Sequence, residues 1–155
     1  ASVQAVICAE IGHLELAHDY AYEAALIDLQ DLHHNSRDGL HMASLAGAWM
    51  ALVYGFGGLR DTDGELSFDP QLPSAISRLR FTIRWQGLRL GVDVTHDEAT
   101  YTLRDGPDAS LTLRHDGAAM TVDTSAPVSR PVKKRTATLP RPEQPPGREP
   151  MSRSR

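Results

Sequence analysis

The stretch from residue 40 to residue 54, LHMASLAGAWMALVY, carries no formally charged side chain when His41 is neutral. Its many Ala, Leu and Met residues predict a helix, and a helix that is apolar on every side must be covered on every side. Two helical segments precede it, at residues 2–11 and about 13–33, where apolar residues recur at three- and four-residue spacing. Those segments and a small sheet cannot cover it, so we expect the chain to be part of a longer protein that supplies further helices.

After the glycine-rich segment GFGG at residues 55–58, the apolar period changes from helical to two. Apolar and polar residues alternate through residues 79–85 and 88–94, which flank a Gln86-Gly87 turn. The same alternation continues further along the chain, at residues 101–103, 111–113 and 120–122, with turns at Asp105-Gly106 and Asp116-Gly117. We predict an antiparallel meander with one apolar face and an earlier strand near residues 65–68. The predicted fold class is therefore α+β.

The last part of the chain differs in composition from the rest. Seven of the ten prolines lie from residue 127 onward, together with eight basic and two acidic residues. This composition buries too little apolar surface to offset the entropy of ordering, so it predicts a disordered tail. The expected domains are helices at 1–58, an antiparallel β-domain at 59–126 and the tail at 127–155.

Charge and cysteine content exclude several classes of protein. With a net charge of −4 for the chain and about +6 in the tail, residues 1–126 carry about −10, which does not suit a nucleic-acid-binding face. A single cysteine, Cys8, excludes an internal disulfide framework and fits a reducing, cytoplasmic location. No apolar run reaches the length of a membrane span. We therefore expect neither a nucleic-acid partner nor a membrane partner.

The strongest candidate for a functional residue is His41, in the first turn of the uncharged helix. Unpaired N–H groups at a helix N-terminus favour an anion, and an imidazole there could add a hydrogen bond to phosphate or to a sugar hydroxyl. Alternatively, Asp38 caps the helix and His41 is a buried, satisfied histidine. Residue spacing leaves both interpretations open.

Other possible motifs point to ordinary structure. Adjacent His33 and His34 would project about 100° apart on a helix, and no further metal-ligand spacing accompanies them. The acidic segment at 61–65 lacks the full ligand set of a calcium loop and is more typical of a β-turn. We expect no metal site and no cofactor.

Several blocks of the sequence resemble the end of the catalytic barrel and the start of the C-terminal domain in glycoside hydrolase family 65. These blocks are AALID (24–28), DLHHN (31–35), RDGLH (37–41), ASLAGAW (43–49), GFGG (55–58), SFDP (67–70) and LRFTIRW (79–85). The family includes maltose, trehalose and kojibiose phosphorylases and related hydrolases. The resemblance implies the last helices of an (α/α)6 barrel followed by a small antiparallel β-domain.

The same resemblance implies a chemistry. Family members cleave α-glucosidic disaccharides with inversion, through a glutamic acid as general acid and with phosphate or water attacking the anomeric carbon. His41 matches the histidine that helps to hold the phosphate, Asp38 and Gly39 would shape its turn, and Ser44 is a further candidate. The general acid is expected upstream, so the chain would contribute part of the phosphate site but not the acid.

Two functions from different classes follow. The first is the C-terminal portion of a glucose-disaccharide phosphorylase or hydrolase, with disaccharide and inorganic phosphate as partners and a homo-oligomer as an open possibility. The second is a non-catalytic binding or assembly module, which the missing general acid and the basic tail favour.

Overall fold

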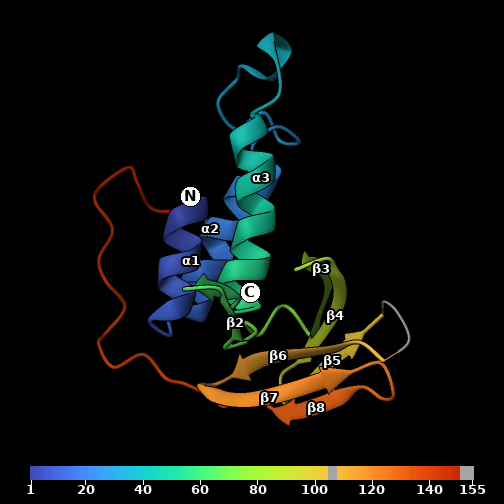
Figure 1. The fold of residues 1–155 in the computed structure, drawn as a ribbon. Coiled ribbons are helices and arrows are strands. Elements are labelled where there is room, and N and C mark those ends of the chain that lie inside the picture. Colours follow the sequence, from blue (N-terminus) through green and yellow to red (C-terminus); the bar gives the residue numbers. More distant parts are fainter. Residues whose placement is uncertain (105–107, 151–155) are drawn as a thin grey trace. The chain divides into compact units, whose positions relative to one another are not determined.

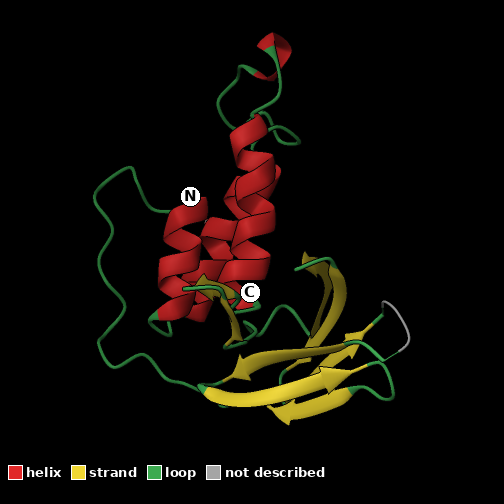
Figure 2. Cartoon of the chain, in the orientation of Figure 1, coloured by secondary structure: helices red, strands yellow, loops and turns green. Residues whose placement is uncertain are grey.

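The computed structural model describes residues 1–104 and 108–150 of the 155-residue chain. They form two compact units, one comprising residues 1–56 with the C-terminal residues from 135, and the other residues 57–134 (Figure 1). The first unit is helical and the second is built of strands (Figure 2). This confirms the α+β class predicted from the change in apolar period. The expected Asp105-Gly106 turn lies outside the described residues.

The first unit contains three α-helices and two shorter helical segments. They are α1 (Ser2–Glu10), α2 (Leu14–Leu26), the 3-10 turn η1 (Ser36–Asp38), α3 (Met42–Met50) and the π-helical segment η2 (Ala51–Phe56). Their shared core includes Ala5, Leu16, Ala17 and Phe56, each at most 1% exposed. The helices predicted at 2–11 and 40–54 are thus confirmed, apart from small shifts at their ends.

The helix predicted for residues 13–33 is too long, because α2 ends at Leu26 and residues 27–34 form turns. Asp31 and His34 have positive φ angles of 48° and 55°, which break the helical path. The Asp31 carboxylate accepts a hydrogen bond from the Ser36 backbone N–H at 3.0 Å. Polar contacts made by the acids of this segment therefore override its helical periodicity.

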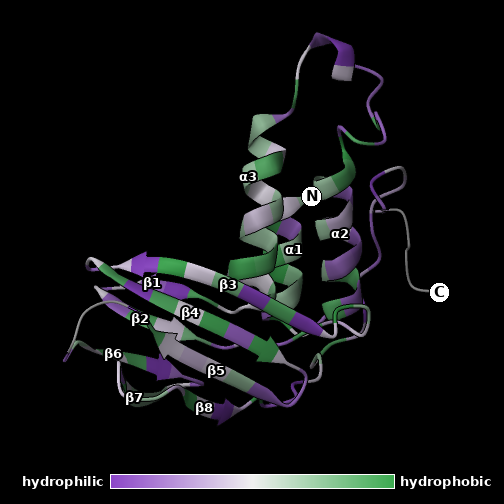
Figure 3. Ribbon diagram, turned by 90° about the vertical axis from the view of Figure 1, so that its right-hand side faces the viewer, coloured by the Kyte–Doolittle hydropathy of each residue, from purple (hydrophilic) through white to green (hydrophobic). Residues whose placement is uncertain are grey.

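Helix α3 leaves large apolar side chains uncovered in the described chain. Its surface is almost free of hydrophilic residues in Figure 3, and only Gly47 within it is buried. Exposure reaches 70% for Met42, 47% for Trp49 and 44% for Met50. On α1, Val3 and Ile7 are similarly exposed, at 65% and 51%. Such a concentration of exposed apolar side chains is typical of a surface that another layer covers.

The second unit holds two four-stranded sheets. In the first sheet the order is β1-β2-β6-β7, and in the second it is β3-β4-β5-β8. The strands are β1 (Arg60–Thr62), β2 (Glu65–Phe68), β3 (Arg78–Trp85), β4 (Leu88–Thr95), β5 (Glu98–Leu103), β6 (Ser110–His115), β7 (Ala118–Asp123) and β8 (Val128–Pro131).

Strands β2 to β7 and the Gln86-Gly87 and Asp116-Gly117 turns were predicted correctly, but β1 and β8 were not expected and the single meander was wrong. The chain leaves the meander after β5, and β6 pairs in parallel with β2 and antiparallel with β7. Residue alternation shows which face of a strand is apolar but not which strand pairs with it. The apolar face therefore finds its partner layer within the same unit.

The core of this unit lies between the two sheets. The ring of Phe68 in β2 lies 5.2 Å from that of Tyr101 in β5 and 6.4 Å from that of Phe81 in β3, between centroids. His115 of β6 joins the sheets by hydrogen bonds, with its Nε2 3.0 Å from the Pro131 carbonyl oxygen and its Nδ1 2.7 Å from the Tyr101 hydroxyl. Because a carbonyl only accepts, Nε2 carries the hydrogen, and the Tyr101 hydroxyl donates to Nδ1.

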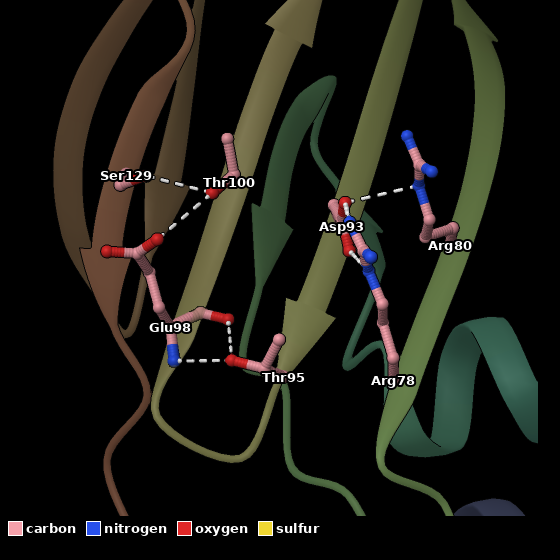
Figure 4. A network of polar contacts seen from close by, with 7 residues as sticks. All are labelled: Arg78, Arg80, Asp93, Thr95, Glu98, Thr100 and Ser129. Atoms are coloured by element: carbon pink, nitrogen blue, oxygen red, sulfur yellow. Dashed lines mark hydrogen bonds and ion pairs between the residues drawn. The ribbon is translucent and has the colours of Figure 1, made fainter.

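The outer face of the second sheet is polar. Asp93 of β4 accepts hydrogen bonds from Nε and Nη2 of Arg78 on β3, at 2.8 and 2.5 Å, and lies 3.1 Å from Arg80 Nε (Figure 4). Thr100 and Ser129 pair their hydroxyls at 2.8 Å across β5 and β8. The two arginines hold the pKa of Asp93 below its usual value. These cross-strand pairs fix the register of a solvent-facing surface.

The predicted disordered tail at 127–155 fails at its beginning, since Val128–Pro131 pairs with β5 as an edge strand. Pairing along the backbone needs no apolar side chain, and Pro131 at the end of an edge strand loses no ladder bond that the sheet requires. Residues 135–150 belong to the helical unit. The last five residues, from Met151 to Arg155, lie outside the described part.

Candidate functional site

The loop between α2 and α3 brings Asp28 and His41 together. The Asp28 Oδ1 atom lies 2.6 Å from the His41 Nδ1 atom, and Oδ2 accepts the His41 backbone N–H at 2.8 Å. The Asp28 side chain is 8% exposed, whereas that of His41 is 30% exposed. One carboxylate therefore fixes both the backbone and the ring of the residue that begins α3.

This contact determines which nitrogen of His41 is available. A carboxylate accepts only, so Nδ1 carries a hydrogen and Nε2 is the free position of the ring. Nε2 lies 3.4 Å from the amide nitrogen of Asn35, which is a weak contact at most. The ring centroid of His33 lies 6.0 Å from that of His41. His41 thus presents Nε2 at the open end of α3, among polar side chains of the loop.

The electrostatics of the pair favour the ionised acid. The hydrogen bond from the His41 side chain, together with that from its backbone, lowers the pKa of Asp28. A carboxylate whose pKa falls on folding stabilises the fold above its unfolded pKa, and that stability is lost as the pH falls through the folded pKa. The Asp28–His41 contact is therefore present at neutral pH and weakens only in strong acid.

Asp28→Asn is expected to lower the melting temperature at neutral pH, because an amide offers one acceptor where the carboxylate offers two. The difference from the native chain should shrink as the pH falls below the lowered pKa of Asp28, where the native acid is also neutral. Thermal melts across pH measure this. Asp38→Asn is the matched control, since the Asp38 side chain is 72% exposed. Equal melting temperatures for D28N and the native chain at neutral pH would contradict the assignment.

The other site residues predicted from the sequence, Asp38, Gly39 and Ser44, lie close to His41 in the chain and differ in the contacts they make. Asp38 ends the turn η1, with its carboxylate 3.8 Å from Arg37, and α3 begins without a side-chain cap, so Asp38 does not have the helix-capping role considered for it. Gly39 has φ of 136°, a conformation that favours glycine, so its role in shaping the turn is physically sound. Ser44 donates its backbone N–H to the His41 carbonyl oxygen at 2.8 Å.

Asp28 is the functional candidate that sequence reasoning missed. It lies in the AALID block, but the helix predicted to run to residue 33 made it one more helical residue with no expected link to His41. Two acids, Asp28 and Asp31, are followed by Asn35 and Ser36, and such residues favour turns over helix. This pattern could have indicated the role of Asp28 from the sequence. A turn there brings Asp28 back to the start of the next helix.

The described residues hold no other group with an obvious catalytic arrangement. Among residues 1–104 and 108–150, no cluster of three or more His, Cys, Asp or Glu side chains could hold a metal ion. In the same ranges, no helix combines the length and the apolar character needed to cross a bilayer. The Cys8 thiol is buried, and burial raises its pKa. His41 and its partners remain the candidate site.

Comparison with known proteins gives this site a context. Residues 1–50 match the model of the glycosyl hydrolase family 65 central catalytic domain, and residues 59–122 match that of the family 65 C-terminal domain. The first match contains Asp28, His41 and the loop between them.

Individual relatives agree with the family matches. An uncharacterized glycosyl hydrolase of Mycobacterium leprae is 67% identical over 153 residues, covering 99% of this chain and 19% of that protein. The α,α-trehalose phosphorylase of Geobacillus stearothermophilus is 39% identical over 111 residues, covering 72% of this chain and 14% of that enzyme. A solved structure described as a putative kojibiose phosphorylase from the human microbiome superposes with a TM-score of 0.75 at 29% identity, covering 83% of this chain and 18% of that one. The chain thus spans about a fifth or less of the length of these relatives.

Proposed function

This chain belongs to glycosyl hydrolase family 65, and we propose that it forms the C-terminal part of an inverting α-glucoside phosphorylase that cleaves a glucose disaccharide. The observation that carries the proposal is the Asp28–His41 pair at the start of α3. Its relatives include enzymes named as trehalose and putative kojibiose phosphorylases. Phosphate is the co-substrate of such enzymes, which need no further cofactor.

The proposed architecture follows from the exposed helix surface. Helices α1, α2 and α3 would be the last helices of an (α/α)6 barrel within residues 1–58, followed by the β-domain at 59–126. The uncovered apolar side chains of α1 and α3 support this, because preceding barrel helices would bury them. A location in the cytoplasm is part of the same proposal.

The proposed chemistry gives His41 a binding role. A phosphate oxygen attacks the anomeric carbon, the glycosidic bond breaks, and a general acid elsewhere in the protein donates a proton to the leaving sugar oxygen. The products are a glucose 1-phosphate of inverted configuration and the released sugar. His41 Nε2 would accept a hydrogen bond from a P–OH group of the phosphate, while Asp28 keeps Nδ1 protonated and the ring oriented. The positive end of the α3 helix dipole would add to the binding of the anion.

The direct test is an assay of the full-length protein that contains this chain. Trehalose, kojibiose and maltose are each incubated with and without inorganic phosphate, and glucose 1-phosphate and glucose are quantified. Cleavage that requires phosphate and yields glucose 1-phosphate supports the proposal. Cleavage to glucose alone would make the protein a hydrolase of the same family, and no cleavage of any disaccharide would favour a non-catalytic module.

A further inference from the structure

The C-terminal segment of residues 135–150, called the strap below, lies along the helical unit (Figure 1). Arg141 of the strap places Nη2 3.6 Å from Asp19 Oδ2, and the Asp19 side chain is fully buried. The Tyr20 hydroxyl donates to the Gln144 side-chain carbonyl. Because a buried carboxylate is costly without a cation nearby, Arg141 ties the strap to α2.

The strap also passes very close to the end of α1. A Cβ atom added to Gly12, whose φ is +88°, would lie 2.9 Å from the Ala137 backbone nitrogen. Such a distance leaves no room for a side chain, so the backbone of the strap and that of the α1–α2 turn are in direct contact. At the other end of the strap, Pro150 is buried. The strap is therefore held along its length rather than at one point.

Beyond Arg141, the strap forms one wall of a cavity of about 980 Å³. Gln144, Arg148 and Glu149 line it from the strap, and Glu23 and His33 line it from α2 and the loop that follows. His33 is the residue whose ring lies 6.0 Å from that of His41. The cavity thus adjoins the candidate phosphate site through one shared histidine contact.

The lining of this cavity has the chemistry of a site for a neutral polar ligand. Arg148 and two acids, Glu23 and Glu149, line the same cavity, so neither a free anion nor a free cation is selected by charge. Among the described residues, no hydrogen bond or ion pair engages the side chains of Arg148 and Glu23, whereas the Glu149 carboxylate accepts the Gly147 backbone N–H at 3.0 Å. Leu32 and Pro145 add apolar surface. Donors, acceptors and small apolar patches together suit the hydroxyl groups and C–H faces of a sugar.

We propose that the strap and α2 form a carbohydrate-binding site, in which Arg148 and Glu23 hold sugar hydroxyls. The choice of carbohydrate rests on the proposed function, while the existence of the site rests on the cavity. The strap lies outside both family matches, which end at residues 50 and 122. The alignment with the Mycobacterium leprae protein, over 153 residues, includes it. The strap's side of the site therefore lies outside the segments that the family models match.

The test compares Arg148→Ala and Glu23→Gln with Arg84→Ala, an exposed arginine of β3 that serves as the matched control. In the full-length protein, isothermal titration with glucose, trehalose, kojibiose and maltose gives the affinity of each variant. Loss of one charged hydrogen-bond partner is expected to weaken sugar binding about tenfold, with the control unchanged and KM for phosphate unaltered. A chain ended after Lys134 should show the same loss.

Equal sugar affinities for R148A, E23Q and the native protein would overturn the proposal, even if the shortened chain fails to fold. The outcome is separable from that of the proposed function. A native protein that binds sugar through Arg148 but releases no glucose 1-phosphate would keep this site and reject the phosphorylase. If the protein releases glucose 1-phosphate but R148A and E23Q bind sugar as tightly as the native protein, the phosphorylase is kept and this site is rejected.

Discussion

His41→Ala in the full-length protein is expected to reduce kcat/KM for phosphate on the order of 100-fold. The substitution removes the ring that Asp28 orients, and a hydrogen bond to a charged group such as phosphate contributes roughly 1.5–3 kcal/mol. Initial rates at varied phosphate, with disaccharide saturating, measure the loss. Most of it should lie in KM, because the ring is proposed to bind phosphate both before and during its attack.

The matched control is His34→Ala, which removes an imidazole from the same loop, where the side chain is 91% exposed. It should leave the rates nearly unchanged. A His41→Ala protein with native KM for phosphate would remove His41 from the phosphate site and leave it as a structural partner of Asp28. Glutamine at position 41 should restore part of the affinity, since its amide can reach phosphate but lacks a second nitrogen for Asp28.

Phe68→Ala is expected to destabilise the β-unit by about 3–5 kcal/mol, as large aromatic truncations in cores do. Phe68 is 1% exposed and lies between the rings of Tyr101 and Phe81, so its loss opens a cavity between the two sheets. Hydrogen exchange of the β5 and β6 amides reports the stability of this unit separately from that of the helices.

Phe68→Leu is the control for this prediction, because it keeps most of the apolar volume and should cost clearly less than alanine. Exchange rates in F68A equal to those of the native chain would mean that the two sheets are held by other contacts. The polar link through His115 is the obvious alternative, and Tyr101→Phe would then show the larger effect.

The sequence predicted the elements of this fold better than their partners. The uncharged stretch at 40–54 and the alternation at 79–94 are local patterns that follow directly from burial, and both gave the correct elements. The parallel pairing of β2 with β6 joins residues far apart in the chain, which no local pattern encodes. The same limit applies to the C-terminal segment, where β8 and the strap depend on a sheet edge and on a buried Asp19 elsewhere in the chain.

In the candidate site, too, local features could be predicted from the sequence, whereas contacts between separate segments could not. His41 could be identified from its position at a helix start, whereas Gly39 was a candidate only through the resemblance to family 65. Asp28 could not, since its role depends on a turn at residues 27–34 that interrupts a strongly periodic helical pattern. The partner that orients the histidine is therefore visible only once the loop is folded.

Strand β8 has a consequence for the solubility of the protein. It pairs with the edge of β5, whose N–H and C=O groups would otherwise be open to pairing with another chain. One side-chain contact across the sheets, from His115 to the Pro131 carbonyl oxygen, secures its end. Loss of that contact would loosen β8 and expose the edge of β5 to pairing with another chain. Variants at position 115 should therefore be more prone to self-association than their effect on stability alone would suggest.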